Sequence, residues 1–283
     1  MTPIKDRKLG TSLCFSREIS PEAFGRLASA GIGCIEYSFG YNHYMNVLEY
    51  PAHSLRYANV ARAAGLENWS IHLPFSGRLD ISNPNNELRD VTIYTNKILI
   101  RAAGRAGVKV AVLHPSSEPI AEEDRPMRME RSRGAIEILK AECDRADMLL
   151  AVENLPRTCL CRTSDEMIAL LSGTGAGVVF DTNHCLVEDN IHYVNKLAEA
   201  GIPIFSIHIS DYFRDENGVL DERHVLPGEG INRWGELLDA LAAAEYEGPL
   251  MYEVPAKPKT RTEPITLEEL SDNMKRLRAG MIK

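Results

Sequence analysis

Polar residues end four apolar, strand-like runs in the second half of the chain, at Glu153, Asp181, His208 and Glu253. A parallel strand buried on both faces gains no stability from a charge at its tip, so four such residues in successive runs indicate chemistry. Two Glu, one Asp and one His supply hard oxygens and an imidazole. This ligand set suits Mn²⁺, Co²⁺, Mg²⁺ or Zn²⁺, with positions left open for a substrate. The sequence therefore predicts a metal-centred active site.

Further candidate ligands follow other strand-like runs or lie close beyond them. They are His72, His114, His184, Glu222 and His224. Chance alone seldom puts so many imidazoles in such positions, so we expect these side chains to lie near the first four.

The elements that position these residues repeat as a strand-like run followed by a helical stretch. The runs lie near residues 9–15, 33–38, 69–73, 108–113, 148–153, 177–181, 203–209 and 249–253. The segments between the runs carry residues typical of helix ends: Ser20 and Pro21 predict a helix start, and Gly31 predicts its end. Right-handed crossovers between eight parallel strands close most economically into a (β/α)8 TIM barrel, an α/β fold whose active sites lie at the carboxyl ends of the strands.

A doubly wound open sheet is the alternative fold, but no G-x-G-x-x-G or P-loop motif follows any of the runs. No Gly/Ser-rich or Pro-rich linker divides the 283 residues, so we expect a single domain over residues 1–283.

Composition narrows the classes of function. The chain is 44% hydrophobic and 25% charged, as an ordinary soluble protein is. It has neither a signal-peptide pattern nor a stretch of about 18 to 20 apolar residues, so we expect a cytoplasmic protein without a membrane span. Six cysteines without a C-x-x-C pair indicate free thiols. The net charge of −8 disfavours a nucleic-acid partner and favours a small-molecule substrate.

The sequence resembles the xylose isomerase-like superfamily of barrels, which includes sugar phosphate isomerases, ketose 3-epimerases and apurinic endonucleases of family 2. The resemblance covers nearly the whole chain. It rests on Glu153-Asn154, Asp181-Thr182-Asn183-His184, His208-Ile209-Ser210-Asp211, the segment from His224 to Gly230, Trp234 and Glu253.

The isomerase and epimerase branch implies a metal-dependent enzyme acting on a sugar or sugar phosphate. By this resemblance, one divalent metal is held by Glu153, Asp181, His208 and Glu253. His184 and Arg214 would contact substrate oxygens, and we add His72 as a substrate-binding candidate. Such members often form homo-oligomers through helices at the barrel edge.

The chemistry expected of this set is proton transfer through a metal-stabilised enediolate. Glu153 and Glu253 are the catalytic candidates: one takes a proton from one face of the substrate and the other returns a proton on the opposite face, which inverts a carbon centre. If only one carboxylate acts, the same site would interconvert an aldose and a ketose. The sequence does not distinguish epimerisation from aldose–ketose isomerisation.

The apurinic endonuclease branch is the alternative, with a multinuclear zinc site for phosphodiester hydrolysis. Its nine ligands have counterparts here in His72, His114, Glu153, Asp181, His184, His208, Glu222, His224 and Glu253. Glu222 departs from that branch, which has an aspartate there. A duplex-binding face needs several basic residues, and Lys257, Lys259 and Arg261 form a basic loop that could instead hold a sugar phosphate.

A barrel that binds a metal and a sugar without catalysis is a third possible function, beside the isomerase or epimerase and the endonuclease. Aromatic residues after the second strand-like run could form a stacking wall for the sugar; they are Tyr37, Phe39, Tyr41 and Tyr44, with His43 among them.

Overall fold

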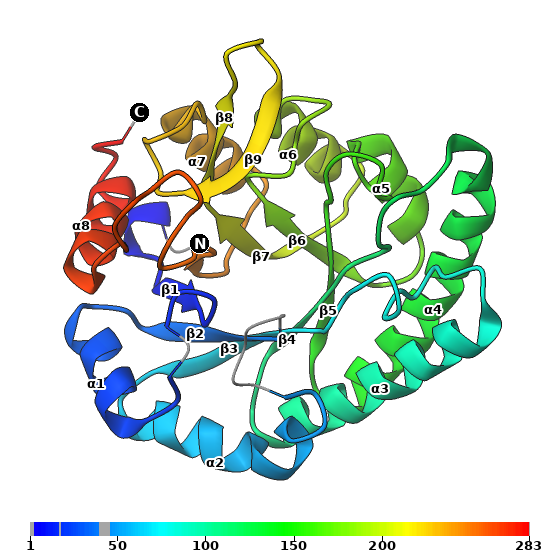
Figure 1. Cartoon of the computed structure of the whole chain (residues 1–283), viewed down its shortest axis with the longest axis horizontal. Helices are drawn as coiled ribbons and strands as arrows, with labels where there is room; N and C mark the ends of the chain where they lie inside the picture. Colours follow the sequence, from blue (N-terminus) through cyan, green and yellow to red (C-terminus); the bar gives the residue numbers. More distant parts are fainter. Residues whose placement is uncertain (1–2, 17, 40–45, 283) are drawn as a thin grey trace.

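Eight parallel strands form a closed barrel in the computed structural model of the chain, which describes residues 3–16, 18–39 and 46–282 (Figure 1). The barrel strands are β1 (Leu9–Ser12), β2 (Cys34–Ser38), β3 (Glu67–His72), β4 (Val110–Leu113), β5 (Leu149–Glu153), β6 (Gly177–Asp181), β7 (Ile204–Ile209) and β10 (Leu250–Tyr252). Each pairs with its neighbours in chain order, and β1 pairs with both β2 and β10. The predicted (β/α)8 barrel is confirmed, and the open sheet is excluded.

Helices surround the strands as an outer ring (Figure 1). They are α1 (Pro21–Ser29), α2 (Tyr50–Ala63), α3 (Asn86–Arg105), α4 (Arg125–Arg145), α5 (Ser164–Leu171), α6 (Asn190–Glu199), α7 (Trp234–Ala243) and α8 (Leu267–Arg278), with short 3-10 turns at Ile4–Asp6 and Glu122–Asp124. The start of α1 is as the sequence predicts, because the Ser20 hydroxyl accepts a hydrogen bond from the Ala23 amide at 3.1 Å.

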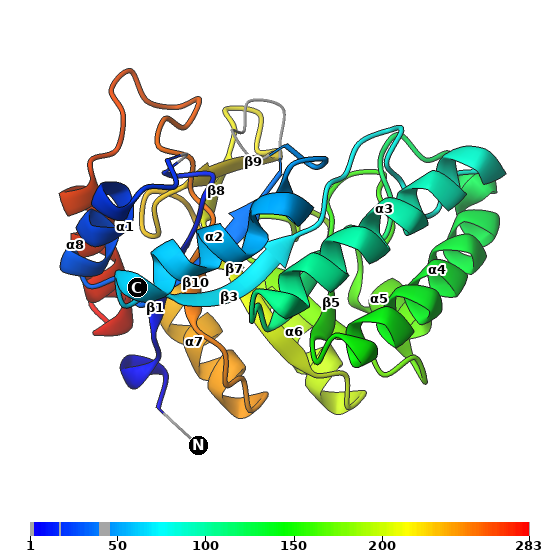
Figure 2. The ribbon, with the colours of Figure 1, turned by 90° about the horizontal axis from the view of Figure 1, so that it is seen from below.

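An antiparallel hairpin interrupts the repeat between β7 and α7. It consists of β8 (Asp211–Arg214) and β9 (Leu220–Val225). Figure 2 shows this hairpin at the same end of the barrel as the long loop between β10 and α8. The sequence analysis did not predict it, because most of its residues are polar and only partly buried, which leaves little apolar alternation to detect.

The barrel interior is filled by side chains. Val110, Val112, Ala151 and Val179 form its apolar layer, with Trp69 and Phe205 packed against them. Phe205 requires a glycine beside it, since a Cβ at Gly177 would lie 2.5 Å from its ring. The larger apolar core lies between strands and helices, and this packing gives the strand ends a rigid base.

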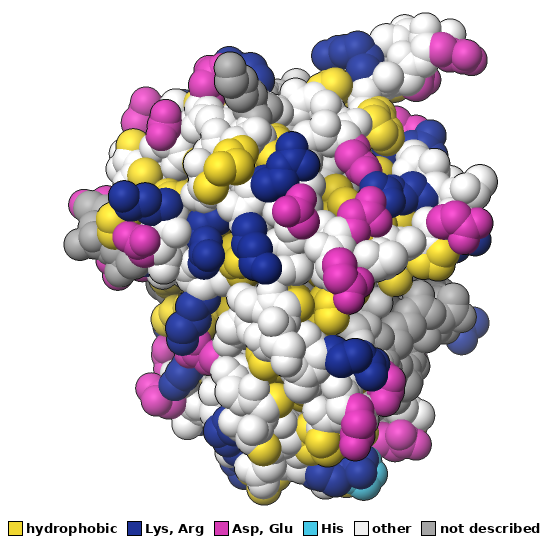
Figure 3. All heavy atoms as spheres, turned by 90° about the vertical axis from the view of Figure 1, so that its left-hand side faces the viewer, with side chains coloured by type: hydrophobic (Ala, Val, Ile, Leu, Met, Phe, Trp, Pro, Cys, Tyr) yellow, Lys and Arg dark blue, Asp and Glu magenta, His cyan; other side chains and the backbone are white. Residues whose placement is uncertain are grey.

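The outer surface carries mixed charge. On the face shown in Figure 3, Lys and Arg side chains lie interspersed with Asp and Glu side chains. In the part of the chain that the structure describes, no helix has the length and apolar character needed to cross a membrane.

Candidate active site

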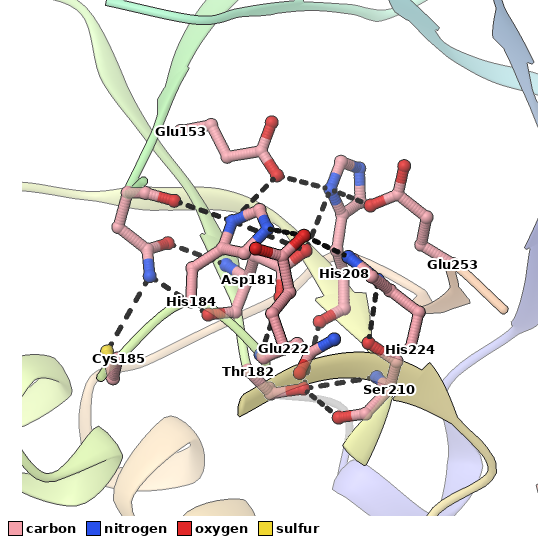
Figure 4. A network of polar contacts seen from close by, with 12 residues as sticks. Glu153, Asp181, Thr182, His184, Cys185, His208, Ser210, Glu222, His224 and Glu253 are labelled. Carbon is pink, nitrogen blue, oxygen red and sulfur yellow. Dashed lines mark hydrogen bonds and ion pairs between the residues drawn. The ribbon is translucent and has the colours of Figure 1, made fainter. Parts of the chain in front are cut away.

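The four predicted metal ligands converge at the carboxyl ends of β5, β6, β7 and β10. Their ligand atoms all lie within 4.8 Å of one another. The centre of the group is His208 Nδ1, which lies 3.1 Å from Glu153 Oε1, 3.0 Å from Glu253 Oε2 and 3.8 Å from Asp181 Oδ2. Figure 4 shows Glu153 and Glu253 approaching His208 from opposite sides.

The donor set fits a divalent cation. Bond lengths of about 2.0 to 2.2 Å to nitrogen and oxygen ligands place neighbouring ligand atoms about 3 Å apart, close to the separations around His208. Asp181 is fully buried, yet its Oδ2 has no hydrogen-bond partner among the described residues. A buried carboxylate oxygen that accepts no hydrogen bond and lies beside two other carboxylates is costly unless positive charge compensates it. These four residues could therefore hold a metal.

Two more histidines meet the other oxygen of Glu153. His72 Nε2 lies 3.2 Å from Glu153 Oε2, and His114 Nε2 lies 2.9 Å from it. With His208, His72 and Glu153 form a second group of candidate ligands. Glu153 is thus shared between two possible ion positions.

The hairpin supplies a third group. His224 Nε2 lies 3.2 Å from Glu222 Oε1, and His184 Nε2 lies 3.7 Å from the same oxygen. Asp181, His184 and His224 also offer ligand atoms within 4.8 Å of one another. The structure therefore brings together every metal-ligand candidate named from the sequence.

Asn154 holds the neighbouring strand end and one histidine in place. Its Nδ2 donates to the Asp181 carbonyl at 2.9 Å, and its Oδ1 accepts from the Asp181 amide at 2.7 Å. The Asn154 backbone carbonyl lies 2.9 Å from His184 Nδ1. When that nitrogen carries the proton, the Nε2 lone pair of His184 faces the hairpin.

The buried Asp211 fixes the hairpin over the site. Its carboxylate accepts hydrogen bonds from the backbone amides of Gly228 and Asn232, both at 3.0 Å, and from Trp234 Nε1 at 2.9 Å. Gly230 allows this loop to lie close, because a Cβ there would be 2.3 Å from the Tyr212 carbonyl. The motif from His224 to Trp234 thus positions β9, which carries Glu222 and His224.

A cavity of about 250 Å³ opens above these groups. Its walls include the loops after β3, β4 and β5 and all the ligand candidates except Asp181 and His208, which lie beneath the surface. Phe75 is 44% exposed and stacks on His114 with ring centroids 3.7 Å apart. Arg157 also lines the cavity, donates from Nε to Glu118 Oε1 at 2.9 Å and pairs with Glu222. Among the described residues, Arg157 is the only Lys or Arg that lines the cavity.

Some residues named from the sequence lie elsewhere. Arg214 is exposed on the hairpin, where Nη1 donates to the Gly218 carbonyl at 2.7 Å, and it does not line the cavity. Tyr37 and Phe39 are buried against Tyr50 rather than forming a stacking wall. The other members of that expected wall, Tyr41, His43 and Tyr44, are outside the described residues.

The sequence analysis missed Glu36, Phe75, Glu118 and Arg157. Glu36 is a charged residue in the middle of the apolar run of β2, and that position is a detectable signal. Phe75 is an aromatic residue directly beyond the His72 segment. Glu118 and Arg157 belong to irregular loops whose path no periodic pattern reveals.

Burial and crowding of charge alter the acidity of these side chains. Burial raises the pKa of Asp181 to about 7, despite the opposing charges of His184 and His224. Burial lowers the pKa of His72, but the hydrogen bond and charge of Glu153 outweigh it, so that the pKa rises to about 9. Burial also lowers the pKa of His184, but the charges of Asp181 and Glu153 and the hydrogen bond and charge of Glu222 together outweigh it, so that the pKa rises to about 10.

These shifts predict how the metal-free protein responds to pH. Histidines whose pKa is higher in the folded state stabilise the fold below about pH 6.5, and that stabilisation is lost as pH rises toward 9 or 10. We expect the free energy of unfolding in chelator to fall by about 2 kcal/mol or more between pH 6.5 and 9.5. Urea denaturation at the two pH values measures it, and equal or greater stability at pH 9.5 would contradict these shifts.

A closed barrel of eight parallel strands with a polar cluster at their carboxyl ends places the protein among the TIM barrels. The sequence profile of one family, the xylose isomerase-like TIM barrel, matches residues 24–279. The chain therefore belongs to the xylose isomerase-like TIM barrel family.

Comparisons with individual proteins agree with this family. An uncharacterized protein of Methanocaldococcus jannaschii is 23% identical over 258 residues, which are 88% of this chain and 84% of that protein. A D-tagatose 3-epimerase-like protein has a similar structure, with a TM-score of 0.79, 20% identity and coverage of 97% of this chain and 98% of the other.

Two further solved structures share the fold. A D-psicose 3-epimerase has a TM-score of 0.75 at 16% identity, covering 96% of this chain and 97% of its own. A 3-keto-D-glucoside 4-epimerase from E. coli has a TM-score of 0.74 at 16% identity, covering 97% and 100%. At such identities the similarity establishes the common fold.

Proposed function

We propose that this protein is a metal-dependent isomerase or epimerase that moves a proton on a keto-sugar or its phosphate. The observation that carries the proposal is the convergence of Glu153, Asp181, His208 and Glu253, whose ligand atoms lie within 4.8 Å of one another. Glu153 and Glu253 of this group line the cavity. Structural neighbours described as epimerases of psicose and of a keto-glucoside, and one described as D-tagatose 3-epimerase-like, support the same reaction class.

A proton on a carbon next to a carbonyl is weakly acidic, so its removal needs stabilisation of the negative charge that develops on oxygen. A divalent cation bound by the four residues would supply that charge stabilisation. The chain itself supplies the proton carriers. Glu153 and Glu253 both line the cavity, and each contacts His208 Nδ1.

The two carboxylates differ in their access to solvent. The side chain of Glu153 is 1% exposed, and that of Glu253 is 18% exposed. Burial raises the pKa of Glu153, but the charges of His208 and His114 outweigh it and hold the pKa well below its usual range. Burial raises the pKa of Glu253 too, but the charge and hydrogen bond of His208 outweigh it and hold that pKa below its usual range. Both carboxylates are therefore ionised and able to accept a proton, and the more exposed Glu253 can also exchange protons with water.

The proposal is tested by incubating the metal-loaded protein in D₂O with a panel of ketoses and ketose phosphates. Incorporation of deuterium next to the carbonyl, lost on treatment with chelator and restored by added Mn²⁺ or Co²⁺, supports it. Absence of exchange with every keto-sugar in a protein that retains its metal would refute it. The product's configuration then distinguishes epimerisation from aldose–ketose isomerisation.

The basic loop after β10 provides a prediction about the phosphate. Lys257 is exposed and does not line the cavity, and Arg261 is paired with Glu229 and Glu269. We expect Lys257→Ala to change kcat/KM by less than about threefold, and equally for phosphorylated and free sugars, because an exposed charge contributes under about 1 kcal/mol. A selective loss of at least about tenfold with the phosphorylated sugar would instead assign the phosphate to Lys257.

A specific observation favours a second candidate, a zinc-dependent phosphodiester hydrolase. The groups around His72 and His114, and around His184, Glu222 and His224, lie beside the first group as a multinuclear site requires. Two observations weigh against it: Glu222 is paired with Arg157, and phosphate-rich polymers need more than one lining cation. Hydrolysis of bis(4-nitrophenyl) phosphate or abasic DNA by the zinc-loaded protein, without ketose exchange, would establish this candidate.

A further inference from the structure

A further carboxylate lies inside the barrel, below the cluster at the strand ends. Glu36 stands in the middle of β2 and is fully buried. Its Oε2 accepts a hydrogen bond from Ser70 Oγ at 2.7 Å and lies 3.1 Å from His208 Nε2. Its Oε1 has no hydrogen-bond partner among the described residues. Burying a carboxylate in this way is costly for folding, so its position calls for an explanation.

The explanation lies in the two ring nitrogens of His208, which have different neighbours. Its Nδ1 faces Glu153, Asp181 and Glu253, whereas its Nε2 faces Glu36. A neutral imidazole has one N–H and one lone pair. If Nε2 carries the proton, it donates to Glu36, and the lone pair of Nδ1 is directed into the cluster. In the opposite tautomer, the lone pair of Nε2 would face the Glu36 carboxylate, and the N–H of Nδ1 would point at the ion.

We propose that Glu36 is a positioning residue that fixes the tautomer and ring orientation of His208, so that Nδ1 is available to a divalent cation. This inference rests on the metal-binding part of the proposed function. Glu36 itself is in none of the three groups of candidate ligands found among the described residues. It therefore acts on the ion through His208, as carboxylates behind metal-bound histidines commonly do.

The barrel is built to hold this arrangement. β2 and β3 are hydrogen-bonded neighbours, and their register sets Ser70 opposite Glu36. β10 and β1 separate β7 from β2 around the barrel, so the contact between His208 and Glu36 crosses the barrel interior. Side chains from three strands thus fix the orientation of one imidazole.

The test measures Co²⁺ affinity by calorimetry, in the absence of substrate, for wild type, Glu36→Gln and Glu36→Ala. We expect both variants to bind Co²⁺ about 10- to 100-fold more weakly, as loss of such a partner usually does. Glu142→Gln is the matched control: Glu142 is also a buried carboxylate, 3% exposed, but it pairs with Arg101 on the outer helices, and we expect wild-type affinity. Glu36→Gln is nearly isosteric and decides the matter if Glu36→Ala does not fold.

A second readout reports the tautomer. In the Zn²⁺-loaded protein, ¹⁵N shifts of the His208 ring should show a protonated Nε2 and a metal-bound Nδ1, and Glu36→Gln should weaken or redistribute this pattern. Affinity within about twofold of wild type in Glu36→Gln, with an unchanged ring pattern, would overturn the inference. Normal Co²⁺ binding without ketose exchange in wild type would refute the proposed reaction but leave the role of Glu36 intact.

Discussion

Glu153→Gln and Glu253→Gln should each reduce deuterium incorporation into the substrate by about 10²- to 10⁴-fold, the range expected when a positioned acid or base is removed. Both carboxylates line the cavity and contact His208 Nδ1, so an amide in either place removes a proton carrier and weakens a candidate ligand. The measurement is NMR of the substrate in D₂O with saturating metal. Saturation separates loss of proton transfer from loss of the ion.

Glu118→Gln is the matched control for that experiment. Glu118 lines the same cavity, but the contact of its carboxylate is with Arg157 rather than with the ligand group. We expect its exchange rate to remain within about tenfold of wild type. Exchange that continues unchanged in both Glu153→Gln and Glu253→Gln would eliminate the two-carboxylate mechanism. If only one variant is inactive, a single carboxylate transfers the proton, as in aldose–ketose isomerisation.

His208→Ala should abolish most of the thermal stabilisation that a divalent cation gives to the protein. An ion at a free concentration of 100 times its Kd stabilises the folded state by about 2.7 kcal/mol, which corresponds to a rise in Tm of about 4 to 5 °C for a chain of this size. His208 Nδ1 is the atom that the three carboxylates share, so its removal dismantles the group. Calorimetric scans with and without Co²⁺ measure the effect.

His192→Ala controls for the general loss of an imidazole. His192 lies exposed on α6, and its side chain is in none of the ligand groups. The variant should keep the full rise in Tm. A rise of wild-type size in His208→Ala would show that the ion binds elsewhere, for example among Asp181, His184 and His224.

Much of the fold could be predicted from the sequence, because buried parallel strands are short continuous apolar runs with distinct ends. The runs near 148–153 and 177–181 match β5 and β6, and both end on a polar residue of the candidate ligand group, Glu153 and Asp181. Since the strands are parallel, residues that end successive runs must share one end of the barrel. That topology explains why the candidate ligands lie together, although their binding of a metal stays a prediction.

Features of the site that depend on tertiary contacts could not be predicted from the sequence. Glu36 faces the barrel interior, and nothing in the pattern of β2 reveals that His208 lies opposite it. Arg157 enters the cavity from an irregular loop, whereas Arg214 points into its own hairpin turn. A side chain's direction in such segments is set by local backbone geometry, which local composition does not encode. The role of Arg214 in substrate binding stays a prediction without a supporting contact.

The metal content of the protein, purified without chelator and determined by elemental analysis, tests the central claim most directly. The account predicts about one manganese, cobalt, magnesium or zinc ion per chain, lost in His208→Ala, because only one of the three candidate groups among the described residues offers four ligands. Close to three zinc ions per chain would contradict it and favour the phosphodiester hydrolase, with His72, His114, Glu222 and His224 as ligands. A chain that neither contains nor takes up a divalent metal would contradict both.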